Sequence, residues 1–141
     1  MGKAVFNTHL WPPPPPHNDN DDASGGAESW FPPPTTDTKY IYVHRPPRDD
    51  AASFYHHLTH MPPSEGGIDA DVTKFVKEWV EGKVAYGMWG DHLDKWLGFA
   101  RGNDNVLVVS YVDMRQDLFG VLLQVRDHLG LDLSEEAVKE K

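Results

Sequence analysis

Two short apolar runs constrain the fold more than any other feature of the sequence, namely residues 40–43 (YIYV) and 105–111 (NVLVVSY). Such runs are typical of strands that are buried between two layers of helices. Helical patterns separate the two runs and follow the second one, so we predict an α/β fold with parallel strands joined by crossovers. Because two or three strands make a small sheet with unprotected edges, we expect this fold to be incomplete.

The clearest helix is predicted over residues 71–82, where apolar residues recur at i, i+3, i+4, i+7 and i+8. Asp71 is its expected N-cap and Gly82 its terminating residue. The apolar stripe consists of Val72, Phe75, Val76, Trp79 and Val80.

A helix is also predicted over residues 49–60, directly after the first strand. Asp49 or Asp50 can cap its start, and the sequence MPP at 61–63 prevents its continuation. The same helix carries Ser53, which we expect about one turn from its start.

Three helices complete the pattern. One spans residues 89–100, and another spans 118–129 and ends at Gly130. The last opens at Ser134, with two acidic residues in its first turn. We expect Leu93 and Trp96 to face inward from the first of these helices.

Composition divides the chain near Tyr40. Residues 11–38 contain two proline runs and an acidic polar stretch, and such a mixture buries too little apolar surface to offset its ordering entropy. We interpret this segment as a Pro-rich, acidic linker or insertion. We expect residues 1–10 to form a short strand with a candidate functional histidine, His9, and residues 39–141 to form a partial folded domain.

Charge and composition exclude several classes of function. The chain has 13 Lys and Arg against 22 Asp and Glu, which opposes general electrostatic binding to nucleic acid or anionic membranes. It has no cysteine, so disulfides and Cys-type metal sites are excluded. No segment approaches the ~20 apolar residues that span a membrane, and no signal peptide is evident. We expect a soluble, cytoplasmic chain.

Arg45 and Ser53 form a candidate anion site. In parallel sheets, ligands bind beyond the carboxyl ends of the strands, where helix N-termini point. Arg45 stands at such a strand end, and its guanidinium can converge with the Ser53 hydroxyl on a phosphate. The alternative is that Arg45 pairs with Asp49 or Asp50 at the surface while Ser53 is a solvated helical serine.

Three blocks of sequence resemble the cytosolic sulfotransferases. The first, YIYVHRPPRDDAASFYHHL (40–58), is similar to the family's YVxRNPKDxAxSYYHF. The second, FVKEWVEGKVAYGMWGDHLDKW (75–96), is similar to its F-x-x-F-x-x-G-x-V-x-Y-G-S-W-x-x-H-V-x-x-W. The third, VLVVSYVDMRQDLFGVLLQVRDHLGLDLSEE (106–136), resembles L-x-x-x-Y-E-D-M-K-x-D and the helix that leads to F-L-G-x-x-L-S-E-E.

The resemblance implies a P-loop-NTPase-like parallel sheet with flanking helices. It also implies transfer of a sulfuryl group from 3′-phosphoadenosine 5′-phosphosulfate (PAPS) to a small-molecule acceptor, which is an alcohol, a phenol or an amine. In the family, the arginine and serine of the first block bind the 3′-phosphate of the donor, a role that falls on Arg45 and Ser53. The tyrosine that reaches the adenine corresponds to Tyr111.

His9 is the candidate catalytic base that the resemblance implies. The family places its base in a K-[TS]-H-L-P motif, and the sequence FNTHLWP matches it at Thr8, His9 and Leu10. Asn7 stands where the family has lysine, and an amide brings no positive charge to the leaving group.

Two elements of the family pattern have no counterpart in the sequence. These are the phosphate loop Y-P-K-S-G-T-T-W ahead of the base and the R-K-G loop that completes the 3′-phosphate site. Backbone N–H groups of a phosphate loop are the main cradle for such a ligand. We therefore expect the chain as given to bind PAPS poorly and to turn over little or nothing.

Other functions remain as alternatives. The sequences LWPPPPP and WFPPPTT resemble ligands of polyproline-reading domains, which makes residues 11–35 a candidate for binding such a partner. On this alternative the chain is a non-catalytic sulfotransferase remnant or an interaction protein. His56 and His60 are spaced as a zinc pair on one helix face, but no third ligand is evident, and we expect no metal. The resemblance also allows a homodimer.

Overall fold

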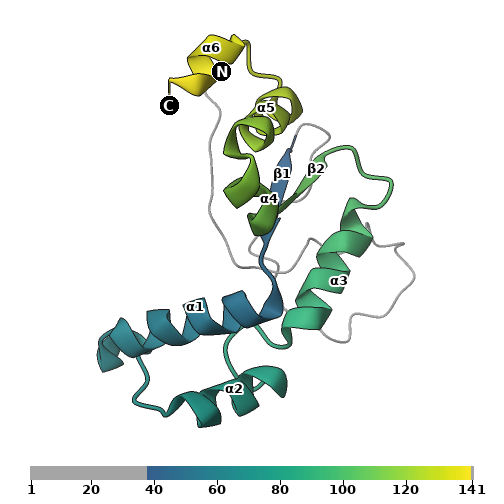
Figure 1. The fold of residues 1–141 in the computed structure, drawn as a ribbon. Helices are drawn as coiled ribbons and strands as arrows, with labels where there is room; N and C mark the ends of the chain where they lie inside the picture. The colour runs from purple at the N-terminus through teal and green to yellow at the C-terminus, as the bar shows by residue number, and fades with distance from the viewer. Residues whose placement is uncertain (1–37, 141) are drawn as a thin grey trace, which may run out of the picture.

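The computed structural model of the chain describes residues 38–140 (Figure 1). The predicted segment 1–10 and the candidate base His9 lie outside the described residues, as does all of the proline-rich segment except Thr38.

The sheet consists of two parallel strands, β1 (Tyr40–His44) and β2 (Val106–Ser110), within the part of the chain that the structure describes. The register pairs Tyr40 with Val106 and His44 with Ser110. Both strands therefore end at the same edge of the sheet, and the prediction of parallel strands with helical crossovers is confirmed.

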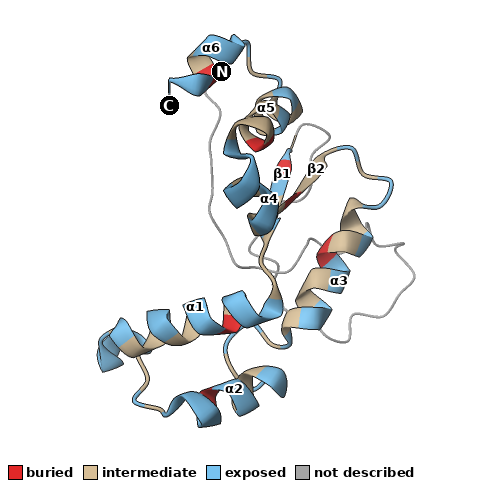
Figure 2. Cartoon of the chain, viewed as in Figure 1, coloured by how far each residue is buried: buried red, intermediate tan, exposed pale blue. Residues whose placement is uncertain are grey.

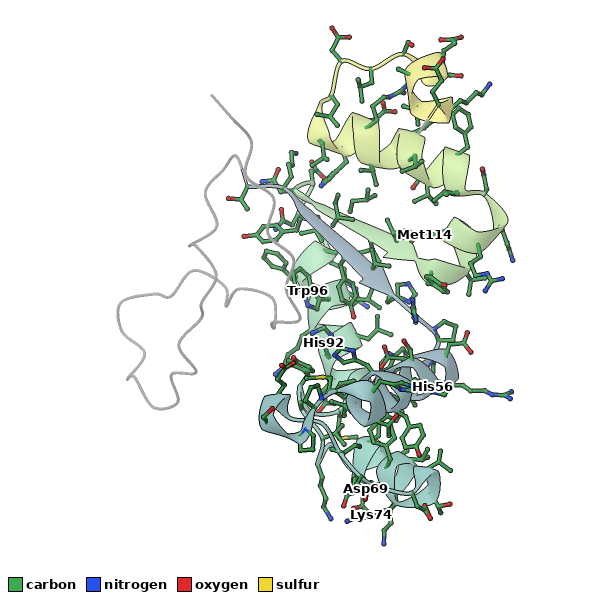
Figure 3. All side chains as sticks on the ribbon, turned by 90° about the vertical axis from the view of Figure 1, so that its left-hand side faces the viewer. His56, Asp69, Lys74, His92, Trp96 and Met114 are labelled. Carbon is green, nitrogen blue, oxygen red and sulfur yellow. The ribbon has the colours of Figure 1, made fainter. Side chains whose placement is uncertain are left out.

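The helix α3 (Trp89–Ala100) covers one face of this sheet, as Figures 1 and 3 show. The Trp96 ring lies 6.1 Å from the Tyr40 ring and stacks on Tyr42 at 5.0 Å with an interplanar angle of 8°. Phe99 contacts Tyr40 edge-on at 5.4 Å. Trp96 is buried, which confirms that it faces inward.

The helix α5 (Leu118–Leu129) lies on the other side of the sheet (Figure 1). It packs beside β2, and Val109 of β2 and Val121 of α5 are both buried. The prediction that the first strand is buried on both faces was wrong, because Ile41 is 39% exposed and Val43 47% exposed. Side chains alternate between faces along a strand, so these two lie opposite Tyr40 and Tyr42, on the face that no described helix closes over β1.

The helix α1 (Pro47–His60) begins two residues earlier than predicted. Asp49 and Asp50 lie in its first turn and neither is the N-cap, which is Pro46. A proline at the first helical position suits a helix because that position needs no N–H donor and its φ is already helical. The helix ends at His60, as predicted, and a short 3₁₀ turn, η1 (Pro63–Glu65), follows.

The helix α2 (Val72–Val80) has the predicted N-cap. The Asp71 carboxylate accepts hydrogen bonds from the backbone N–H groups of Thr73 (2.6 Å) and Lys74 (3.0 Å). Those bonds from Lys74 and Thr73 lower the pKa of Asp71. Phe75 of α2 is only 1% exposed and packs on Phe54 and Tyr55 of α1, at 6.0 Å and 5.3 Å between ring centroids.

The C-terminal part follows the predicted pattern with one addition. The short helix α4 (Tyr111–Gln116), which directly follows β2, was not predicted. Gly130 adopts φ 59° at the end of α5, and Ser134 caps α6 (Glu135–Lys139). None of the helices described here is both long and apolar enough to cross a membrane.

Buried residues are few among those that the structure describes, and they lie in separate patches (Figure 2). One patch lies around the sheet and its two covering helices, and a second lies between α1 and α2. The pair α1 and α2 is set beyond the carboxyl end of β1 (Figure 1), so the strand ends and the start of α1 meet where a ligand of a parallel sheet is expected.

Candidate functional site at the carboxyl ends of the strands

Arg45 and Tyr111 meet at the carboxyl edge of the sheet. Each residue follows directly on one strand, and the last residues of the strands, His44 and Ser110, are register partners. The Arg45 guanidinium carbon lies 4.0 Å from the centroid of the Tyr111 ring, well within the distance of a cation–π contact. Two of the predicted donor-site residues are therefore brought together.

The start of α4 explains the position of Tyr111. The Ser110 hydroxyl accepts a hydrogen bond from the backbone N–H of Val112 at 3.2 Å and so caps the helix. Because the helix begins immediately after the strand, Tyr111 is its first residue. Its side chain leaves the backbone at the corner between strand and helix, beside Arg45.

No ion pair joins Arg45 to Asp49 or Asp50 among the residues that the structure describes. The surface ion pair that the sequence left open as an alternative is thus absent here. The contact observed for the guanidinium is the aromatic face of Tyr111. Within residues 38–140 no carboxylate forms an ion pair with this guanidinium, so its positive charge can serve an anion.

Ser53 is on α1, but it is not hydrogen-bonded to Arg45 in the described structure, and its side chain is exposed. The expected position one turn into the helix was wrong, because the helix begins at Pro47 and Ser53 is six residues further on. At 3.6 residues per turn this is closer to two turns.

A polar aromatic pair beside this edge was not predicted. The Tyr42 hydroxyl lies 3.2 Å from Nδ1 of His92 on α3, and the Tyr42 ring stacks on Trp96. Figure 3 labels His92 and Trp96 on α3, next to β1. Burial, and after it the negative charge of Asp50, raises the pKa of Tyr42 to about 12. His92 matches the histidine of the W-x-x-H pattern quoted above, and that match is the sequence signal from which a role for His92 could have been predicted.

No third metal-ligating side chain joins His56 and His60 within the described residues, where no group of three such side chains occurs. Their rings lie 6.1 Å apart, and Nδ1 of His60 is 2.7 Å from the backbone carbonyl of His56. Because a carbonyl only accepts hydrogen bonds, that ring nitrogen carries the proton. This hydrogen bond holds the His60 ring against its own helix.

A family model described as the sulfotransferase domain matches residues 30–141. The chain belongs to the sulfotransferase family. The match includes the strands, Arg45, Ser53 and Tyr111, and it begins after His9, so it does not test the base.

Curated sulfotransferases support this membership. Human sulfotransferase 2B1 is 34% identical over 102 residues, which is 71% of this chain and 27% of that protein. Rabbit amine sulfotransferase is 36% identical over 101 residues, which is 71% of this chain and 32% of that protein. The chain thus spans about a third or less of these relatives.

Solved sulfotransferase structures have the same fold. Mouse sulfotransferase SULT7A1 in complex with PAP superposes with a TM-score of 0.67 at 28% identity, covering 74% of this chain and 36% of that one. Retinol dehydratase with androsterone and the inactive cofactor PAP gives a TM-score of 0.61 at 28% identity, covering 72% of this chain and 29% of that one. The predicted fold class, a P-loop-like parallel sheet with flanking helices present only in part, is confirmed.

Proposed function

We propose that this chain contributes part of the donor-nucleotide site of a PAPS-dependent sulfotransferase. The observation that carries the proposal is the contact between Arg45 and Tyr111 at the carboxyl ends of the parallel strands. It joins a permanent positive charge, which suits a phosphate, to an aromatic side chain, which suits an adenine. Solved relatives that contain PAP support this ligand class.

The 3′-phosphate is assigned to Arg45 and Ser53. The N–H groups of a guanidinium lie in one plane, and from there they can donate to phosphate oxygens. The Ser53 side chain is exposed on α1, so a phosphate that lies between α1 and the strand end can accept from both side chains. Tyr111 is assigned to the adenine.

The reaction is sulfuryl transfer. The acceptor oxygen or nitrogen attacks the sulfur of PAPS, the bond from sulfur to the bridging phosphate oxygen breaks, and 3′-phosphoadenosine 5′-phosphate leaves. His9 is the proposed base that takes the proton of the acceptor. With Asn7 in place of the motif lysine, one cation that would stabilise the departing phosphate is missing.

The acceptor is proposed to be a small molecule with a hydroxyl or amine group. The relatives support this class, since retinol dehydratase has been solved in complex with androsterone and in complex with retinol, and a second relative is named an amine sulfotransferase. Whether a homodimer forms stays a prediction.

The test is thermal unfolding of the full chain with and without 3′-phosphoadenosine 5′-phosphate. A ligand at 100 times its dissociation constant stabilises a competent site by about 2.7 kcal/mol. We expect the melting temperature to rise, and we expect Arg45→Ala and Ser53→Ala to abolish the rise. A melt that does not respond to the ligand would contradict the proposal.

Matched controls separate a specific site from general binding. Arg101→Ala removes an exposed arginine away from the strand ends, and Ser64→Ala removes an exposed serine in η1. Both should keep the ligand response. Adenosine 5′-phosphate, which lacks the 3′-phosphate, should stabilise the unmodified chain less, and its effect should not depend on Ser53.

A further inference from the structure

An apolar groove lies between α1 and α2 and begins at the first turn of α1. Its cavity is about 410 Å³, within the range of sites that hold a ligand or a peptide. The lining is almost entirely apolar, with one cation, Arg48, among it. From α1 it comprises Pro47, Arg48, Ala51, Ala52 and Tyr55, and from α2 Val72, Val76, Trp79 and Val80.

The groove leaves much of the predicted apolar stripe of α2 open. Phe75 is buried against α1, but Val72, Val76 and Val80 are 53%, 42% and 58% exposed. An amphipathic helix normally buries such a stripe against a neighbouring element. The exposed side chains therefore mark a surface that fits a further apolar segment.

Two aromatic side chains give the groove a specific chemistry. The Tyr55 hydroxyl donates a hydrogen bond to the backbone carbonyl of Ala70 at 3.1 Å, which fixes its ring. Within residues 38–140 no hydrogen bond of the Trp79 indole N–H is found. A polyproline II helix presents apolar rings together with carbonyls that have no internal partner. Aromatic-lined grooves bind such helices, and an indole N–H can donate to their carbonyls.

We propose that the groove between α1 and α2 binds the proline run of this same chain at residues 11–16 (WPPPPP). The connecting segment, residues 17–37, is long enough. A chain of about 20 residues without regular structure has a root-mean-square span of ~25 Å. Pro47 at the groove is nine residues from Thr38 along the chain, at most ~30 Å away. A linker whose span matches the distance gives an effective concentration in the millimolar range.

Length and charge favour this run over the second one. The second proline run ends at Pro34, four residues before Thr38, and four residues reach at most ~14 Å. The groove begins beyond β1, which alone is about 13 Å long at ~3.3 Å per residue. The second run is therefore too close to β1 to lie along the whole groove. The run at 11–16 is followed by a polar stretch, HNDNDD at 17–22, which contains three aspartates. Arg48 at the groove makes no ion pair in the described residues, and its charge complements that stretch.

The experiment is paramagnetic relaxation enhancement on the full chain. Because the sequence has no cysteine, a single Lys77→Cys at an exposed position of α2 accepts one spin label without other changes. The indole N–H signal of Trp11 should lose most of its intensity. The matched control is a label at Gln124→Cys, an exposed position of α5, which should leave that signal intact.

Substitutions in the run and in the groove test the recognition itself. Replacing all prolines at 12–16 by serine should abolish the effect of the label on α2. Trp79→Phe keeps an aromatic ring but removes the indole N–H, and it should weaken the effect. Trp89→Phe, outside the groove lining, is its control and should weaken the effect less.

Several outcomes would overturn the proposal. It fails if the Trp11 signal is unaffected by the label on α2, if both labels broaden it equally, or if the serine variant still shows the effect. A further sample mixes two forms of the chain. One form carries the spin label at natural isotope abundance, and the other is isotope-labelled and carries no spin label, so any broadening in the mixture comes from contact between two chains. Broadening only in that mixture would show that a second copy, and not the same chain, occupies the groove.

Discussion

At the scale of residues, the proposed anion site depends on the contact between Arg45 and Tyr111. A guanidinium in solution can turn in many directions, and a bound phosphate has to compensate for the entropy it loses. Stacking on the Tyr111 ring restricts Arg45 before any ligand arrives. The aromatic face thus restricts the cation and leaves its charge in place. A carboxylate would have neutralised that charge.

The coupling between these two side chains can be measured without ligand. Arg45→Ala, Tyr111→Leu and the double variant form a double-mutant cycle in chemical unfolding. We expect an interaction of about 0.5–1 kcal/mol, as for a cation–π pair that is partly open to solvent. Tyr111→Phe should retain most of it, because the ring face is kept. A coupling of zero would mean that the stack does not form in solution.

Tyr42 gives a prediction about alkaline pH. Burial, and then the charge of Asp50, raises its pKa to about 12, above the ordinary value of about 10. The folded chain therefore holds this proton at pH values where the unfolded chain loses it. Its contribution to stability is complete below about pH 10 and is lost as the pH rises toward about 12.

The measurement is a titration of tyrosinate absorbance. We expect Tyr42→Phe to remove the step of highest pKa and to lessen the loss of stability above pH ~10. Tyr86→Phe, at a position that is 52% exposed, is the control and should leave that step in place. The assignment would be wrong if the control removed it instead.

At the scale of elements, one side chain joins α1 to α2. Phe75 is 1% exposed and contacts two aromatic residues of α1. Phe75→Ala should lower the free energy of unfolding by about 3–5 kcal/mol, and Phe75→Leu by less than about 1.5 kcal/mol. Chemical denaturation would measure both. Val72→Ala, at a position that is 53% exposed, should have a much smaller effect, and equal effects at the two positions would contradict this packing.

Local signals explain which elements could be predicted from the sequence. Asp71, Gly130 and Ser134 act within one helical turn of their own positions, and each lies where the sequence predicted it. The start of α1 was missed because two prolines read as an interruption, whereas Pro47 is the first residue of the helix. The helix α4 was missed because Tyr111 continues an apolar run, and only the cap at Ser110 ends the strand.

At the scale of the whole molecule, the candidate site could be predicted only where topology determines it. Arg45 and Tyr111 follow adjacent parallel strands, so parallel pairing alone brings them to one edge. The position of Ser53 and the pair of Tyr42 with His92 depend on where a helix starts and how it is rotated against the sheet. Those quantities come from packing between distant segments, which no short pattern records.

The two prolines between β1 and α1 have a mechanical consequence. Pro46 and Pro47 have restricted φ angles, and Arg45, as a residue before proline, is held in an extended conformation. The corner is therefore stiff, which opposes pivoting of α1 about it when the proposed nucleotide binds. A motion of α2 against α1 can instead use the turn after η1, where Gly66 adopts φ 96°, a conformation that glycine reaches without strain. The proposed anion site would then stay rigid while α2 moves.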